Sequence, residues 1–149
     1  MPQVNVDIEV LQEVTDDVVE AFGRLLPQLS SSAEPLDATA LAAIVAAPAS
    51  TLLVARVEGK IVGSLTLVTF PIPTGVRAWI EDVVVDEAAR GKPLRVAEAL
   101  TVEALRLARE SGARTVDLTT RPSRVAAGRL YERVGFEQRE SRLYRYNLS

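Results

Sequence analysis

The segment from residue 80 to residue 95 constrains the fold more than any other part of this chain. It begins at Ile80 with a strand pattern that becomes continuously apolar at the three valines of positions 83–85, passes through a short polar turn, and ends where a long amphipathic pattern begins. Such a run predicts a strand buried on both faces of a sheet. A strand that leads into a helix N-terminus can present backbone N–H groups to an anion. The turn also carries Arg90, Lys92 and Arg95, so the segment predicts a ligand that bears phosphate.

Composition limits the chemistry that can occur beside this turn. The 149 residues are 48% hydrophobic and 25% charged, as in a folded globular domain, and their net charge of −3 disfavours a general affinity for nucleic acid or anionic membranes. The chain contains no cysteine and no histidine, which excludes disulfides, Ser–His and Cys–His pairs and nearly every zinc or haem site. Proton transfer must then fall to Asp, Glu, Tyr, a terminus or water. Neither a signal peptide nor a membrane span is indicated, and we expect a cytoplasmic protein.

Hydrophobic periodicity predicts one α/β domain over residues 1–149, with a central mixed sheet flanked by helices. The expected order is β-α-α-β-β-β-α-β-α-β. The strand–helix–strand unit in the second half of the chain should have a right-handed crossover connection. The expected strands are residues 3–12, 51–57, 61–70, 77–85, 114–119 and 136–148. The first two expected helices run from the Thr15–Asp17 cap to about residue 29, and from 38 to 47 after the Asp37 cap. The last two run from about residue 94 to Gly112, and from 124 to 134, where Gly135 ends the helix.

This element order resembles the GNAT superfamily of acetyl-CoA-dependent N-acyltransferases. The resemblance covers essentially the whole chain and is sharpest at residues 81–105 and 121–136. In the second segment, Tyr131 followed by Gly135 and Phe136 matches the family's last-helix signature. The resemblance implies acetyl-CoA as co-substrate, an amine as acceptor and direct transfer between them. With no cysteine or histidine in the chain, no metal is expected.

The turn before the long helix fits the family's pyrophosphate-binding pattern only in part. Arg90, Gly91 and Lys92 fit, but Pro93 and Arg95 stand where the family has small residues. Pro93 has no N–H group, and one lost hydrogen bond to a charged group costs about 1.5–3 kcal/mol. Arg95 adds a side chain that would either block the site or bring a positive charge toward a phosphate. The remaining backbone donors are the N–H groups of Gly91, Lys92, Leu94 and Arg95.

The resemblance also implies roles for individual residues. The backbone of Val83 and Val85 would bind pantetheine and polarise the thioester carbonyl, Tyr131 would protonate the leaving thiolate, and Ser123 would contact CoA. Glu81 is the expected general base, because strand alternation would place it on the same face as Val83. Asp82 is the second choice for that role, and Trp79, on the face of Glu81, would line an acceptor pocket.

Each role has a purely structural alternative. The valines would be core strand, Tyr131 a core residue of the last helix, Glu81 a solvated or salt-bridged carboxylate, and Ser123 an N-cap. The three basic side chains would form a solvated surface. The acids between residues 15 and 47 would suit a cationic amine, but they serve equally well as helix caps and surface charge.

Three functions therefore compete at this point. The first is an N-acetyltransferase that acts on a small molecule or a protein amino group. The second is a non-catalytic member of the same fold, with a degenerate CoA site, that senses a ligand or binds a protein. The third is the binding of another phosphate-bearing ligand at the same helix N-terminus. The final edge strand is compatible with a homodimer.

Overall fold

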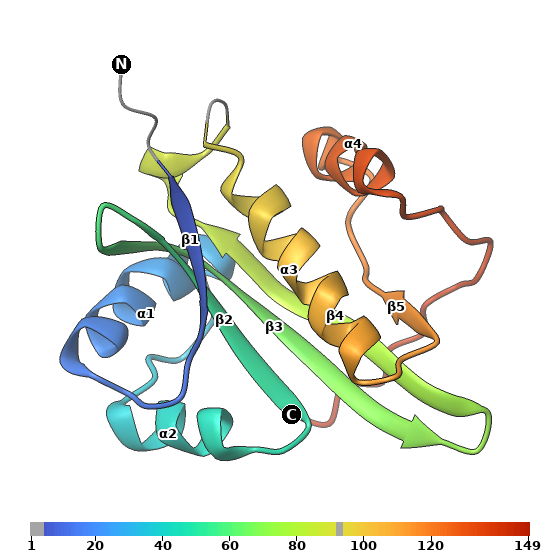
Figure 1. Ribbon diagram of the computed structural model, residues 1–149, viewed down its shortest axis with the longest axis horizontal. Helices are drawn as coiled ribbons and strands as arrows, with labels where there is room; N and C mark the ends of the chain where they lie inside the picture. Colours follow the sequence, from blue (N-terminus) through green and yellow to red (C-terminus); the bar gives the residue numbers. More distant parts are fainter. Residues whose placement is uncertain (1–4, 92–93) are drawn as a thin grey trace. The chain divides into compact units, whose positions relative to one another are not determined.

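The computed structural model describes residues 5–91 and 94–149, and the chain divides into two compact units between Thr119 and Thr120. The fold class is confirmed, because strands and helices follow one another in the expected order as far as the last helix (Figure 1). The first unit contains β1 (Val6–Val10), α1 (Asp16–Leu29), α2 (Ala38–Ala46), β2 (Ser50–Val57), β3 (Lys60–Ile72), β4 (Gly75–Val85), a 3-10 turn (Glu87–Ala89), α3 (Val96–Glu110) and β5 (Thr115–Asp117), and the second contains α4 (Val125–Val134).

The five strands of the first unit form one mixed sheet in the order β1-β2-β3-β4-β5. Neighbours are antiparallel except β4 and β5, which are parallel and joined by the α3 crossover. The β2–β3 hairpin turns at Glu58 and Gly59, whose φ angles of 51° and 81° belong to a two-residue turn with positive φ at both positions. The β4–β5 ladder has only three residue pairs, from Arg77–Thr115 to Trp79–Asp117.

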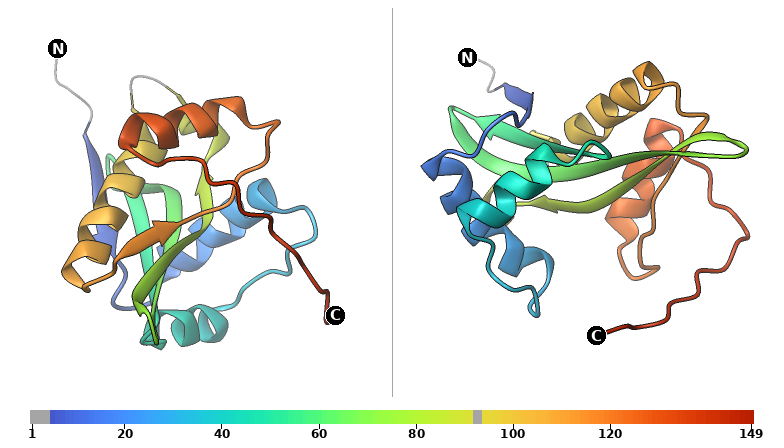
Figure 2. Two further views of the ribbon diagram at one scale, coloured as in Figure 1. Left: turned by 90° about the vertical axis from the view of Figure 1, so that its right-hand side faces the viewer. Right: turned by 90° about the horizontal axis from the view of Figure 1, so that it is seen from below.

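Helices cover both faces of this sheet, with α1 and α2 on one face and α3 on the other (Figure 2). The core beneath α1 and α2 gathers buried residues of both helices and of the strands: Leu11, Val18, Ala21, Phe22, Leu25, Leu41, Leu52, Val54, Ile61 and Val84. On the opposite face, α3 packs so closely on β3 that a Cβ atom added at Gly63 would lie 3.0 Å from Val96 Cγ1 and 3.3 Å from Leu100 Cδ1. Gly63 therefore sets the distance between α3 and the sheet.

Several predicted helix boundaries are confirmed and one is wrong. Asp37 caps α2 by accepting a hydrogen bond of 2.8 Å from the Ala40 N–H, and Gly135 ends α4 with a φ of 119°. Ser123, in contrast, is not the N-cap of α4. Arg124 holds that position without a capping side-chain bond, and its own N–H donates to the Arg121 carbonyl in a preceding turn. The helix consequently begins one residue later than predicted.

The predicted final strand at residues 136–148 is also wrong, because no strand follows α4. Tyr144, Tyr146 and Leu148 do alternate in sequence, but their side chains are 85%, 87% and 93% exposed. Alternation marks the two faces of a strand without providing a neighbouring backbone to pair with.

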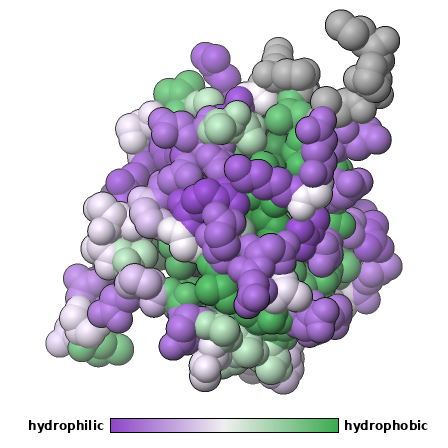
Figure 3. Space-filling view, turned by 90° about the vertical axis from the view of Figure 1, so that its left-hand side faces the viewer, coloured by the Kyte–Doolittle hydropathy of each residue, from purple (hydrophilic) through white to green (hydrophobic). Residues whose placement is uncertain are grey.

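One face of the molecule is mainly hydrophilic (Figure 3). Figure 3 views the side on which β1 and α1 lie, and hydrophilic residues cover most of it. Among the residues that the structure describes, no helix combines the length and the apolar character needed to cross a membrane.

Candidate active site

The candidate site begins at a bulge in the middle of β4. Thr66 of β3 pairs with Glu81, whereas Ser64 pairs with Val84, so β4 has one more residue than β3 in this interval. Asp82 lies in the bulge with a φ of 47°. A left-handed conformation is uncommon for residues other than glycine, although Asp tolerates it better than most because its short side chain can hydrogen-bond locally. The extra residue reverses the faces on which the following side chains lie.

The bulge overturns one prediction, namely that Glu81 shares a face with Val83. Glu81 and Val84 are opposite Thr66 and Ser64, which are two residues apart on β3 and therefore point the same way. Val83, adjacent to Val84, points to the other face. Because Val84 belongs to the core beneath α1 and α2, the exposed carboxylate of Glu81 lies on the α1–α2 face of the sheet.

Trp79 and Asp117 accompany Glu81 on this face. Trp79 pairs with Val68, two residues from Thr66, which confirms that Trp79 and Glu81 share a face. Asp117 pairs with Trp79 across the β4–β5 ladder and therefore points to the same side. Two exposed carboxylates thus flank a half-buried indole ring.

Beyond Trp79, β4 has an open edge on the side of β5. Among the described residues, the ladder between these strands ends at Trp79–Asp117. The Asp86 N–H donates to the Val62 carbonyl of β3 at 2.7 Å, so backbone alternation directs the N–H and C=O groups of Val85 and Val83 to the opposite, open edge. The valines at 83 and 85 are only half-buried, in contrast to the predicted strand with both faces covered.

The end of β4 leads directly into the basic turn. Arg90 is exposed, and its Nε donates to the Val85 carbonyl at 2.9 Å, so this side chain folds back on the open edge of the strand. Gly91 has a φ of 82°, and a Cβ added there would meet no atom within 4 Å. Lys92 and Pro93, two predicted positions of this turn, lie outside the described residues.

The structure contradicts one prediction for Arg95, that its N–H is free to bind a phosphate, and it shows where the Arg95 side chain lies. Its N–H donates to the Gly91 carbonyl at 3.2 Å, so this amide is occupied by the turn itself rather than available to a phosphate. Its φ of 51° and ψ of 49° are left-handed, which explains why glycine suits this position in the family pattern. Its guanidinium extends along α3 and lies 3.9 Å from the Glu98 carboxylate. The side chain lines a cavity of about 540 Å³ together with Leu94, Ile8 and Val102.

The second unit carries Tyr131 and Ser123. The Tyr131 ring packs edge-on against Phe136, with ring centroids 5.7 Å apart and an angle of 69° between the planes. Partial burial raises the pKa of the Tyr131 phenol above its ordinary value of 10.0, and the nearby Arg124 opposes this shift in part. The phenol is therefore protonated at neutral pH. Ser123 is exposed in the turn before α4.

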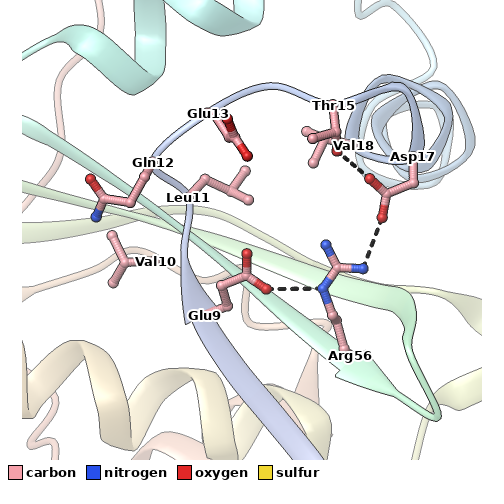
Figure 4. Close-up of a pocket in the computed structure, with 9 residues that line it drawn as sticks. All are labelled: Glu9, Val10, Leu11, Gln12, Glu13, Thr15, Asp17, Val18 and Arg56. Carbon is pink, nitrogen blue, oxygen red and sulfur yellow. Dashed lines mark hydrogen bonds and ion pairs between the residues drawn. The ribbon is translucent and has the colours of Figure 1, made fainter.

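A second polar cavity, of about 390 Å³, lies at the start of α1 (Figure 4). Arg56 spans it, with Nε donating to Glu9 at 3.0 Å and Nη1 donating to Asp17 at 2.8 Å. These bonds join β1, β2 and α1. Within the described residues, no group of three or more Asp or Glu side chains is arranged to hold a metal ion.

Sequence reasoning missed the bulge, Asp117 and the contacts of Arg24. No local pattern predicts a positive φ at an aspartate in a strand. The place of Asp117 beside Trp79 follows only from the parallel register of β4 and β5, and sequence alone does not give that register. Arg24 donates to Asp86, 62 positions away, at 2.6 Å, and such a long-range contact leaves no periodic signal.

Comparisons with known proteins support the fold described above. Residues 11–136 match the Acetyltransferase (GNAT) family, whereas no match was found among curated proteins. A putative acetyltransferase from Agrobacterium tumefaciens is 26% identical, with a TM-score of 0.81 over 95% of this chain and 99% of that one. A Trypanosoma brucei acetyltransferase is 29% identical, with a TM-score of 0.78 over 97% and 100%. A transcriptional regulator from Bacillus halodurans is 28% identical, with a TM-score of 0.76 over 96% and 100%.

The family match spans most of both units, and two of these structures are described as acetyltransferases. Together they support acetyl transfer as the class of reaction, and this chain belongs to the GNAT family of acetyltransferases.

Proposed function

We propose that this protein transfers the acetyl group of acetyl-CoA directly to a primary amine, on a small molecule or on a protein amino group. The observation that carries the proposal is the open edge of β4, which continues into a turn with two glycine-type φ angles and exposed basic side chains. An extended donor with an amide-bearing arm and phosphates matches both parts, because the arm can pair with strand backbone while the phosphates meet the cations.

On the donor side, the backbone of Val83 and Val85 would pair with the pantetheine arm and polarise the thioester carbonyl. Arg90, Gly91, Lys92, Leu94 and Arg95 would surround the pyrophosphate, with Ser123 as a further contact. The direction of the Arg95 side chain toward Glu98 favours an open turn over a blocked one. Arg90 would have to leave the Val85 carbonyl to reach a phosphate, exchanging one neutral acceptor for a charged one.

The reaction itself needs two proton transfers. The neutral amine attacks the thioester carbon, the N–C bond forms and the C–S bond breaks, and the thiolate leaves. Glu81, directly or through water, would take the proton that the amine must lose, with Asp82 as the second choice. Tyr131, which is protonated at neutral pH because its pKa is raised, would donate its proton to the thiolate.

On the acceptor side, Trp79, Glu81 and Asp117 present an aromatic ring between two carboxylates. This combination suits an ammonium group, since the ring face and both anions attract positive charge. An acceptor that is a cation before deprotonation is therefore expected.

The second candidate function is a non-catalytic ligand-sensing or protein-interaction module. It is favoured by the Arg95 side chain in place of a small residue and by the resemblance to a structure described as a transcriptional regulator. In that case Pro93 and Arg95 would have closed the CoA site.

Titration calorimetry with acetyl-CoA tests the two candidates directly. The wild-type protein should bind in the micromolar range, and the Pro93→Gly/Arg95→Gly variant should bind about tenfold to a hundredfold more tightly, the value of one restored bond to a charged group. Binding by the variant alone would overturn the enzymatic proposal and support the non-catalytic module. Better competition by another nucleotide than by CoA would point to a different phosphate ligand.

A further inference from the structure

Two side chains on one face of α1 reach the turn that follows β4. Arg24 Nη1 donates to Asp86 Oδ2 at 2.6 Å, and Arg24 Nη2 donates to the Ile61 carbonyl at 3.1 Å. Four residues later, one helical turn along, Gln28 Oε1 accepts from the Glu87 N–H at 2.8 Å. Gln28 Nε2 also donates to the Arg24 carbonyl at 3.2 Å, which helps to fix its orientation. The helix thus contacts two successive residues of the turn.

This contact is more sheltered than an ordinary surface ion pair. The side chains of Arg24 and Asp86 are 26% and 14% exposed. Asp86 uses both oxygens, because Oδ2 accepts from Arg24 while Oδ1 accepts from the Ala88 N–H at the start of the 3-10 turn. Charge-assisted bonds in such an environment are among the stronger interactions of a folded protein.

The segment held in this way ends at residues assigned above to the donor's phosphates. The Asp86 carbonyl accepts from the Ala89 N–H at 2.8 Å, which closes the one-turn helix, and Arg90 and Gly91 follow immediately. The direction in which Arg90 leaves the sheet therefore depends on the orientation of Asp86 and Glu87.

We propose that Arg24 and Gln28 are positioning residues that hold the Asp86–Gly91 turn in the shape that presents Arg90 to the phosphates of acetyl-CoA. This inference rests on the proposed function. Neither side chain contacts the donor. They act through Asp86 and the Glu87 N–H, so their loss weakens donor binding without removing a catalytic group.

Arg56 of β2 provides a matched control, because it anchors the same helix at another point. Arg56 also bonds to an acid of α1, Asp17, and its side chain is 22% exposed, close to the value for Arg24. Its other partners, Glu9 and Gly59, lie on β1 and in the β2–β3 turn. Arg56→Met therefore removes a comparable anchor of α1 without touching the donor turn.

The experiment measures acetyl-CoA binding by calorimetry, and KM and kcat with an accepted amine, in full-length wild type, Arg24→Met, Gln28→Met and Arg56→Met. Arg24→Met should raise the Kd and the KM for acetyl-CoA at least tenfold, and Gln28→Met threefold or more, while kcat at saturation changes less than threefold. Arg56→Met should leave the Kd within threefold of wild type. Arg24→Lys, which keeps a positive charge near Asp86, should recover part of the loss, and it replaces Arg24→Met should that variant fail to fold.

The outcomes separate the two proposals. Equal weakening by Arg24→Met and Arg56→Met, or an unchanged Kd in Arg24→Met, would overturn the positioning role while leaving the proposed function intact. Absence of acetyl-CoA binding by the wild-type protein would overturn the proposed function, and this inference with it.

Discussion

Asp82 and Arg95 have the same unusual backbone geometry at opposite ends of the candidate donor site. Their φ angles are 47° and 51°, in the region that favours glycine. Each such residue costs of order 1 kcal/mol, and strain of this kind persists where the surrounding structure determines it. At Asp82 it belongs to the bulge that turns Val83 away from the face of Glu81. At Arg95 it joins the turn to α3.

Arg95 offers a test of this strain in the free protein. Arg95→Gly should raise the free energy of unfolding by up to about 1 kcal/mol, because glycine adopts positive φ without a Cβ clash. Arg95→Val should lower it by about 1–2 kcal/mol, because a β-branched residue is least tolerant of this conformation. Urea unfolding of the three proteins checks the order. Equal midpoints for the two variants would contradict a left-handed backbone at this position.

Tyr131 provides a pH test of the proposed chemistry. Because its pKa is raised above 10.0, the phenol stays protonated between pH 7 and 9, and the rate of the proposed reaction should not fall across this range through loss of this proton. Tyr131→Phe should lower kcat about 100-fold with little change in the KM for acetyl-CoA. Steady-state kinetics across that pH range measure both. An unchanged kcat in the variant would mean that Tyr131 only packs against Phe136.

At the scale of elements, Gly63 of β3 lies where α3 approaches the sheet closely. Gly63→Ala should destabilise the protein by about 1–3 kcal/mol, because the added Cβ would lie 3.0 Å from Val96 Cγ1 and 3.1 Å from the Val84 carbonyl. Gly23, inside α1, has no atom within 4 Å of an added Cβ. Gly23→Ala is therefore the control and should stabilise by about 0.5–1 kcal/mol. In thermal unfolding, Gly63→Ala should lower the Tm and Gly23→Ala should raise it. A raised Tm in both variants would contradict the close approach of α3 to β3.

The link between α1 and the donor turn should depend on pH. The Ala88 N–H first, and then Arg24, lower the pKa of the Asp86 carboxyl below 3.8. Because the folded-state pKa is depressed, this stabilisation is present above pH 3.8 and is lost as the pH falls through the lower, folded-state value. Asp86→Asn should therefore be less stable than wild type at pH 7, by about 1 kcal/mol, and the difference should narrow at pH 3. A constant difference in urea unfolding at the two pH values would exclude an ionised anchor.

At the scale of the whole molecule, sequence periodicity predicted most of the fold but little of the site's geometry. The caps at Asp37 and Gly135 and the β2–β3 hairpin are local signals, and each is confirmed. The bulge at Asp82 and the Arg24–Asp86 contact arise from pairing between distant segments, which periodicity does not encode. The face of Glu81 was mispredicted for this reason, since one extra residue reverses an alternation.

The tail provides a test of the mispredicted final strand. Deleting residues 143–149 should change the free energy of unfolding by less than about 0.5 kcal/mol, because the large apolar side chains removed are at least 64% exposed. Circular dichroism should show no loss of strand signal. A destabilisation of 2 kcal/mol or more would mean that the tail packs as a strand. Sedimentation of the full-length and truncated proteins would then show whether the strand pairs within a dimer.

The three-pair ladder between β4 and β5 has a consequence for solubility. Backbone groups that face an open edge are also the groups through which sheets of separate molecules join. A ligand bound along Val83 and Val85 would occupy these backbone N–H and C=O groups. The segment that would bind acetyl-CoA is therefore also the segment through which ligand-free molecules would associate. On this view, saturation with acetyl-CoA would protect the protein from aggregation in addition to preparing it for reaction.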